Sequence, residues 1–158
     1  MRSVHEKTQK PCAVVFALDS INGIQTARIL AKRGIPVIGI AKNPRHYCCR
    51  TKVCKEIIYA DTESEEIIET LELLGPKLQQ KAVLFPCNDL NVLPVSRHRS
   101  RLESWYHVVL SEPDVVEMLM HKTSFYAYAQ KEGFPIPRTF MLADRADAER
   151  AAKTLVFP

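Results

Sequence analysis

Five short apolar runs, separated by amphipathic stretches, dominate the first two thirds of the chain. Each run is almost free of charged side chains, which is typical of strands that are covered on both faces of a sheet. The runs lie at residues 13–18, 35–41, 57–59, 82–85 and 106–110. We expect each of them to form a strand.

The stretches between these runs have the period of helices. Apolar stripes at helical spacing consist of Ile21, Ile24, Ala27 and Leu30, and of Ile67, Ile68, Leu71 and Leu74. Thr62 and Glu65 have the spacing of a capping box before the second stripe. Residues 89–103 form a third candidate helix, and Pro94 limits where it can begin. The alternation predicts an α/β fold, a Rossmann-like parallel sheet with helices on both faces.

The pattern changes after residue 110. Short helices are expected at residues 111–120, 123–131 and 144–153, a strand at 139–142, and the start of a further strand at 155–157. We therefore expect a flexible tail at 1–12, a first domain at 13–110, and at 111–158 linker helices and the start of a second domain. An apolar run that begins at the last residues predicts that the chain is the front of a longer protein.

Composition restricts the class of protein. The chain has 158 residues, 46% hydrophobic and 25% charged, which fits a soluble globular protein and excludes a mainly disordered one. No run approaches the length of a membrane span, and the polar, basic N-terminus does not fit a secretory signal. Five cysteines, two of them adjacent, favour reduced thiols in a cytoplasmic protein. A net charge of +4 does not by itself indicate nucleic-acid binding.

Polar side chains follow three of the predicted strands. Carboxyl ends of parallel strands meet at one edge of a sheet, where such folds bind ligands. The candidate substrate-binding residues at this edge are Asp19, Asn22, Gly23, Lys42, Arg45, Arg50, Asn88 and Asp89. Their mixture of acids, bases and amides suits an amino-acid-like ligand, with Lys42 and an arginine on its carboxylate and an aspartate on its amine.

Simpler interpretations of the same residues stay open. Asp19, Ser20 or one residue of the Asn88–Asp89 pair could be an ordinary helix N-cap. The basic segment from Lys42 to Lys55 could be a solvated loop. Arg97, Arg99 and Arg101 are interpreted as a solvated helix face.

Three other chemistries are disfavoured by spacing. Gly23 is the only glycine in the first strand–helix turn, so the dinucleotide-binding glycine pattern is missing. A zinc site at His46, Cys48, Cys49 and Cys54 does not match the usual ligand spacing, and buried thiols are the favoured alternative. Cys87 precedes a predicted helix N-terminus but has no accompanying base, so a structural thiol is favoured there too.

Five motifs occur in a characteristic order along the chain. They are Leu-Asp-Ser-Ile-Asn-Gly at 18–23, Gly-Ile-Ala-Lys at 39–42, Phe-Pro-Cys-Asn-Asp at 85–89, His-Lys-Thr-Ser-Phe-Tyr at 121–126 and Gly-Phe-Pro-Ile-Pro at 133–137. Together they resemble the N-terminal, pre-ATP-grasp portion of ATP-grasp carboxylate–amine ligases, a superfamily that includes carbamoyl-phosphate-synthase-like and biotin-carboxylase-like enzymes. His121 departs from the pattern, because relatives usually have aspartate there.

The resemblance implies a Rossmann-like domain followed by the start of an ATP-grasp domain. Such enzymes use ATP and magnesium to activate a carboxylate as an acyl phosphate, which an amine then attacks. Lys122 would be a nucleotide-binding residue, and the other ATP and magnesium ligands would lie beyond Pro158. The 158 residues would then hold no catalytic residue and no tightly bound cofactor. The implied partners are a small carboxylate and an amine, with no nucleic acid or membrane and with a homo-oligomer left open.

Two other functions remain as alternatives. One is a stand-alone Rossmann-like module that binds or senses a small molecule. The other is a nucleotide-dependent oxidoreductase, which the missing glycine pattern disfavours.

Overall fold

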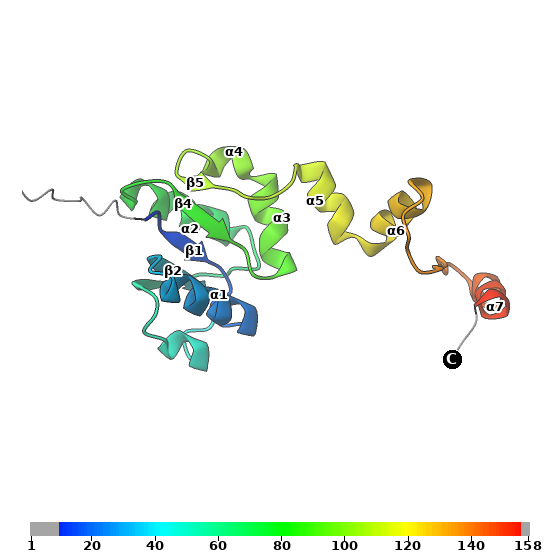
Figure 1. Cartoon of the computed structure of the whole chain (residues 1–158), viewed down its shortest axis with the longest axis horizontal. Helices are drawn as coiled ribbons and strands as arrows, with labels where there is room; N and C mark the ends of the chain where they lie inside the picture. Colours follow the sequence, from blue (N-terminus) through cyan, green and yellow to red (C-terminus); the bar gives the residue numbers. More distant parts are fainter. Residues whose placement is uncertain (1–9, 156–158) are drawn as a thin grey trace, which may run out of the picture. The chain divides into compact units, whose positions relative to one another are not determined.

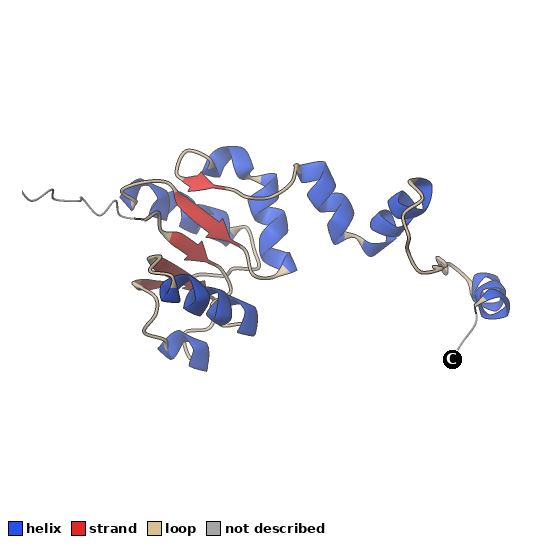
Figure 2. Ribbon diagram, viewed as in Figure 1, coloured by secondary structure: helices blue, strands red, loops and turns tan. Residues whose placement is uncertain are grey.

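A five-stranded sheet, in which every pair of neighbouring strands is parallel, forms the centre of the first part of the chain (Figure 2). The strands are β1 (Ala13–Val15), β2 (Val37–Ala41), β3 (Glu56–Tyr59), β4 (Ala82–Phe85) and β5 (Tyr106–His107). Their order is β3-β2-β1-β4-β5. The chain therefore adds β2 and β3 on one side of β1, and then adds β4 and β5 on its other side. This confirms the predicted α/β fold with a parallel sheet.

The computed structural model describes residues 10–155. The chain divides into two compact units, one up to Val116 and one from Glu117 onward. Residues 1–9 of the predicted tail and residues 156–157 of the last predicted strand lie outside the described residues. The domain boundary predicted after residue 110 stays a prediction.

Helices lie on both faces of the sheet (Figure 1). They are α1 (Ile21–Lys32), η1 (Tyr47–Arg50), α2 (Glu66–Leu74), η2 (Gly75–Lys77), α3 (Asp89–Arg97) and α4 (Arg99–Leu102). Side chains alternate along β1, so that Val15 packs with α1 through Ile24 and Ala27, while Val14 packs with α2 through Ile67. Each face therefore has its own apolar core.

Three of the five strands are shorter than the apolar runs that predicted them, whereas β4 matches its run and β3 begins one residue earlier. β1 ends at Val15, because Ala17 turns the backbone with a φ of 48°. β2 begins only at Val37, after Pro36, which has no backbone N–H to donate to a ladder. β5 ends at His107 rather than residue 110.

The segment after β5 is held by a side chain instead of a strand. The Nη2 group of Arg99 donates to the carbonyl oxygens of Leu110, at 2.7 Å, and of Ser111, at 2.6 Å. The Nε atom of Arg99 is buried and has no hydrogen-bond partner within the described residues. The prediction that Arg99 only forms part of a solvated helix face is therefore wrong.

Two predicted helix features also need correction. The capping box is wrong: α2 begins at Glu66, and Thr62 is buried instead of capping it. The helix expected at 89–103 is two helices that meet at His98, and Pro94 lies inside the first of them.

The second unit contains helices and irregular backbone in the part of it that is described. α5 (Pro113–Met120) crosses the division, and α6 (Lys122–Lys131) and α7 (Arg145–Thr154) follow. The strand predicted at 139–142 is not formed. A strand needs a hydrogen-bonded neighbour, and the described residues of this unit provide none.

Candidate functional site

Asp19 connects the loops that follow β1 and β2. Its Oδ2 atom accepts hydrogen bonds from the backbone N–H groups of Lys42, at 3.1 Å, and Asn43, at 2.7 Å. Ser20 caps α1 instead, since its Oγ accepts from the N–H of Gly23 at 3.0 Å. Asp19 is thus a connector between loops, and the capping alternative holds for Ser20.

Lys42 is already paired with two carboxylates. Its Nζ lies 3.1 Å from Oδ2 of Asp61 and 3.0 Å from Oε2 of Glu63. Hydrogen bonds to Glu63 and then Asp61 raise the pKa of Lys42. The N–H of Glu63 and then the Lys42 ammonium lower the pKa of Asp61. A ligand carboxylate would have to compete with both acids for this ammonium.

Asp61 and Glu63 were not among the predicted site residues. They follow β3, whose carboxyl end lies beside that of β2. The rule that selected the residues after β1, β2 and β4 would have selected these two as well, had it been applied to the third strand.

The start of α3 separates the roles of Asn88 and Asp89. Asn88 is the N-cap, and its Oδ1 accepts from the N–H of Asn91 at 2.9 Å. Asp89 is exposed in the first turn, and its side chain makes no hydrogen bond or ion pair within residues 10–155.

Asn91 ties the first turn of α3 to the loop after β3. Its side chain is completely buried, and its Nδ2 donates to the carbonyl oxygen of Thr62. Its Oδ1 is buried without a partner among the described residues. Together with the contacts of Asp19 and Lys42, this bond links the loops after β1, β2 and β3 to α3.

The remaining predicted residues differ in their placement. Gly23 is buried in the first turn of α1, where a Cβ atom would lie 2.1 Å from the carbonyl oxygen of Ala17, so close packing requires glycine there. The exposed side chains of Asn22, Arg45 and Arg50 make no hydrogen bonds or ion pairs within the described part of the chain. Lys122 is the first residue of α6 in the second unit.

The surroundings of the cysteines fit structural thiols better than reactive ones. All five cysteines are free of disulfides. Burial raises the pKa of Cys87, against a hydrogen bond to Thr26 that lowers it, which does not suit a nucleophile. His46 accepts a hydrogen bond from the N–H of Cys48 through Nδ1, at 3.4 Å. No group of three or more potential metal ligands occurs among residues 10–155.

Within residues 10–155, no helix has the length and apolar content needed to cross a bilayer.

By sequence, the chain matches no protein family profile and no curated protein. By structure, it is similar to N5-carboxyaminoimidazole synthetase from Staphylococcus aureus, with a TM-score of 0.67 and 16% identity over 95% of this chain and 38% of that one. It is similar to the biotin carboxylase domain of 2-oxoglutarate carboxylase from Hydrogenobacter thermophilus, with a TM-score of 0.60 and 16% identity over 92% and 33% of the two chains. The biotin carboxylase subunit of pyruvate carboxylase gives 0.59 and 15% over 94% and 34%.

These neighbours are ATP-grasp enzymes, and the chain has the fold of their N-terminal part. It spans between a third and two fifths of the length of the proteins named above. At this level of identity the similarity establishes the fold.

Proposed function

We propose that this chain is the N-terminal, substrate-binding portion of an ATP-dependent ligase that joins a carboxylate to an amine through an acyl phosphate. The observation that carries the proposal is the structural match over 95% of the chain to a synthetase, together with matches to biotin carboxylases. The match covers nearly all of the chain and therefore extends over both compact units. A bound MgADP and bicarbonate in one of these neighbours supports a role for ATP in the complete enzyme.

The described residues do not themselves fit a magnesium–nucleotide site. They contain no group of three metal-ligating side chains, and Lys122 is a single lysine at the start of α6. We therefore assign ATP and magnesium to other parts of the complete ligase.

For the substrate, we propose the carboxyl edge of the sheet. Asp89 is the acid there without a partner in residues 10–155, so it is our candidate for the ligand's amine. Arg45 and Arg50 are our candidates for its carboxylate, because they are exposed and unpaired in the described chain, whereas Lys42 is held by Asp61 and Glu63. Asp19 would position the two loops rather than bind.

The 158-residue chain is expected not to bind Mg-ATP with micromolar affinity, because residues 10–155 contain no group of three metal-ligating side chains. Isothermal titration with Mg-ATP measures this directly. The control is the product of the complete reading frame, which should bind Mg-ATP and release ADP when a suitable carboxylate and amine are supplied. A micromolar dissociation constant for the 158 residues would contradict our assignment of the ATP site, and a reading frame that stops near residue 158 would refute the ligase.

Asp89→Asn is expected to raise the substrate KM of the complete enzyme by about ten- to a hundredfold, the effect of losing one charge-assisted hydrogen bond. Its free energy of unfolding should change by less than about 0.5 kcal/mol, because Asp89 is not the cap. Asn88→Ala is the matched control and should cost about 1 kcal/mol through loss of the cap. Urea unfolding and steady-state kinetics separate the two effects. Unchanged kinetics in Asp89→Asn would remove this residue from the site.

A further inference from the structure

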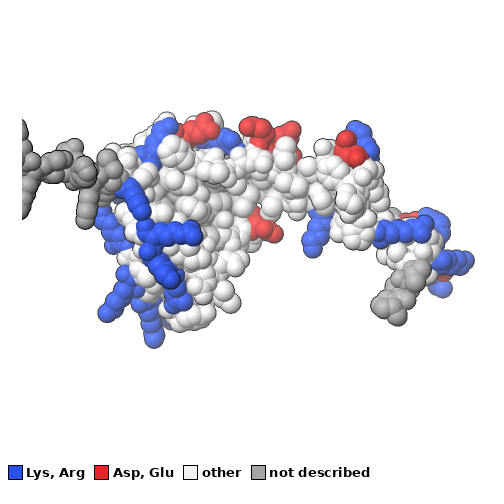
Figure 3. All heavy atoms as spheres, in the orientation of Figure 1, with Lys and Arg blue, Asp and Glu red and all other residues white. Residues whose placement is uncertain are grey.

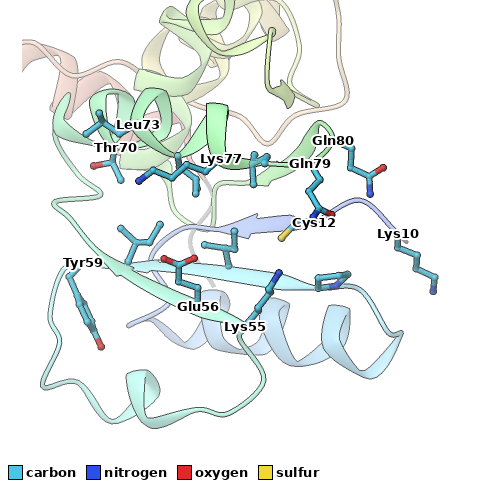
Figure 4. A pocket seen from close by; sticks show the side chains of 15 residues that line it. Lys10, Cys12, Lys55, Glu56, Tyr59, Thr70, Leu73, Lys77, Gln79 and Gln80 are labelled. Atoms are coloured by element: carbon cyan, nitrogen blue, oxygen red, sulfur yellow. The ribbon is translucent and has the colours of Figure 1, made fainter. Parts of the chain in front are cut away.

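A pocket of about 480 Å³ opens at the edge of the sheet where the strands begin, opposite the candidate substrate site. Figure 4 shows it with α2 and η2 on one side and β2 and β3 on the other. Cys12, Pro36 and Lys55 line it just before or at the beginning of β1, β2 and β3, and it extends along β3 to Tyr59. Its volume lies within the range of sites that bind small molecules.

Part of the lining of this pocket is apolar. Its walls include Ile38 and Ile58 from the sheet and Leu74 and Leu78 from α2 and the residues after η2. Ile58 is only half-buried, so apolar surface remains open to solvent here. The reason is that α2 packs against α3 and α4, on the β4–β5 side of the sheet. The hydroxyl of Tyr106 in β5 also donates a hydrogen bond to the carbonyl oxygen of Leu71 in α2. A ligand with an apolar body would remove this surface from water.

The rim of the pocket is basic. Lys10, Lys55 and Lys77 line it, and Glu56 is its single acidic residue. Lys55 and Lys77 make no salt bridge in the described part of the chain, and Lys10 donates to the carbonyl oxygen of Arg33 at 2.7 Å. On the face shown in Figure 3, Lys and Arg side chains also gather on the side of the first unit where the strands begin. Unpaired ammonium groups at the mouth of an apolar pocket favour an anionic headgroup.

We propose that this pocket binds a small organic anion with an apolar body, of the class of medium-chain carboxylates. The apolar body lies against Ile38, Ile58 and Leu74, and the carboxylate meets Lys55 and Lys77. The proposal does not depend on the proposed ligase activity, since none of the candidate substrate-binding residues lines this pocket. It gives the sheet a second ligand site, with lysines at its mouth and apolar side chains in its lining.

Cys12 reports on occupancy of the pocket. Its thiol lies in the lining, and burial raises its pKa, so alkylation by iodoacetamide is carried out at about pH 8.5. Mass spectrometry of each cysteine-containing peptide measures the rate of alkylation. Octanoate is expected to slow the alkylation of Cys12 saturably, at least tenfold at full occupancy. Cys49, which does not line the pocket, should react at an unchanged rate. Octanol lacks the charge of octanoate, and acetate lacks its apolar body. Each should protect Cys12 from alkylation at least tenfold less effectively than octanoate does.

The charge-reversing double variant Lys55→Glu with Lys77→Glu is expected to weaken octanoate protection at least tenfold. The matched control is Lys52→Glu with Lys131→Glu, which makes the same change in net charge at exposed positions outside the pocket. Melting temperatures of both variants show whether each is folded, and Lys77→Gln alone replaces the double variant if it is not. Equal protection by octanol, equal protection in the two double variants, or no protection of Cys12 at saturating octanoate would each overturn the proposal.

Discussion

Replacing Gly23 by alanine is expected to destabilise the first unit by about 3 kcal/mol or more, a large fraction of the stability of a small domain. The added Cβ would lie 2.1 Å from the carbonyl oxygen of Ala17 and 2.9 Å from the Cα of Leu18. Those atoms belong to backbone and cannot rotate away. The same carbonyl oxygen accepts from the N–H of Ser20 at 2.9 Å and from its Oγ at 2.7 Å, so moving it also loosens the turn before α1.

Gly34→Ala is the matched control for this substitution. Gly34 has a φ of 69°, and a Cβ there would meet no atom within 4 Å. Its replacement should cost about 1 kcal/mol, from left-handed backbone strain alone. Urea unfolding of the two variants measures the difference. A Gly23→Ala variant that is as stable as Gly34→Ala would show that the start of α1 can shift freely, and that the glycine is not required for packing.

Raising the pH from 8 to 10 is expected to lower the free energy of unfolding by about 2–4 kcal/mol under reducing conditions. Burial raises the pKa of Cys12 and Cys87, and raises that of Cys54 to about 11. Unfolded thiols release their protons near a pKa of about 8.5, whereas these folded thiols keep theirs. Proton release thus favours the unfolded chain, and stability is lost as the pH rises above the unfolded pKa. Each thiol contributes at most about 1.4 kcal/mol per pH unit, and partly exposed thiols contribute less.

Urea unfolding at several values of pH between 8 and 10 measures this slope. Cys54→Ala should flatten it, because it removes the thiol with the most strongly raised pKa among the four cysteines whose pKa is raised. The prediction is contradicted if the free energy of unfolding of the wild-type chain is constant over this range, or if Cys54→Ala has the same slope as the wild type. Either result would show that the folded thiols ionise as freely as the unfolded ones.

The sheet could be predicted from the sequence because its strands are uninterrupted apolar runs separated by helical stripes. The ends of the elements could not, because contacts between distant residues determine them. β5 stops at His107, and a guanidinium from α4 holds the next residues by their carbonyl groups. Thr62 matched a local capping motif, but it is buried, its carbonyl oxygen accepts from Asn91 of α3, and α2 begins only at Glu66. Neither contact leaves a periodic signal.

The carboxyl edge was predictable in its location and less so in its chemistry. Topology alone indicates that the loops after β1 and β2 are neighbours, and Asp19 does bond to the backbone of Lys42 and Asn43. Topology does not indicate which ion pairs form there. The Lys42 ammonium is shared by Asp61 and Glu63, and this depends on side-chain conformations that no spacing rule encodes. The roles of these residues toward a ligand remain predictions.

The position of β1 has a consequence for the synthesis of the protein. Ala13 pairs with Val37 on one side and with Val83 on the other, so β1 is the central strand, and it is the first of the five strands in chain order. One of its edges gains a partner soon after β2 is made, but the other waits until β4 has emerged. An unpaired apolar strand is a template for association with other chains. The nascent chain is therefore most exposed to aggregation between the emergence of β2 and that of β4, and contacts that wait this long for their partner also slow folding.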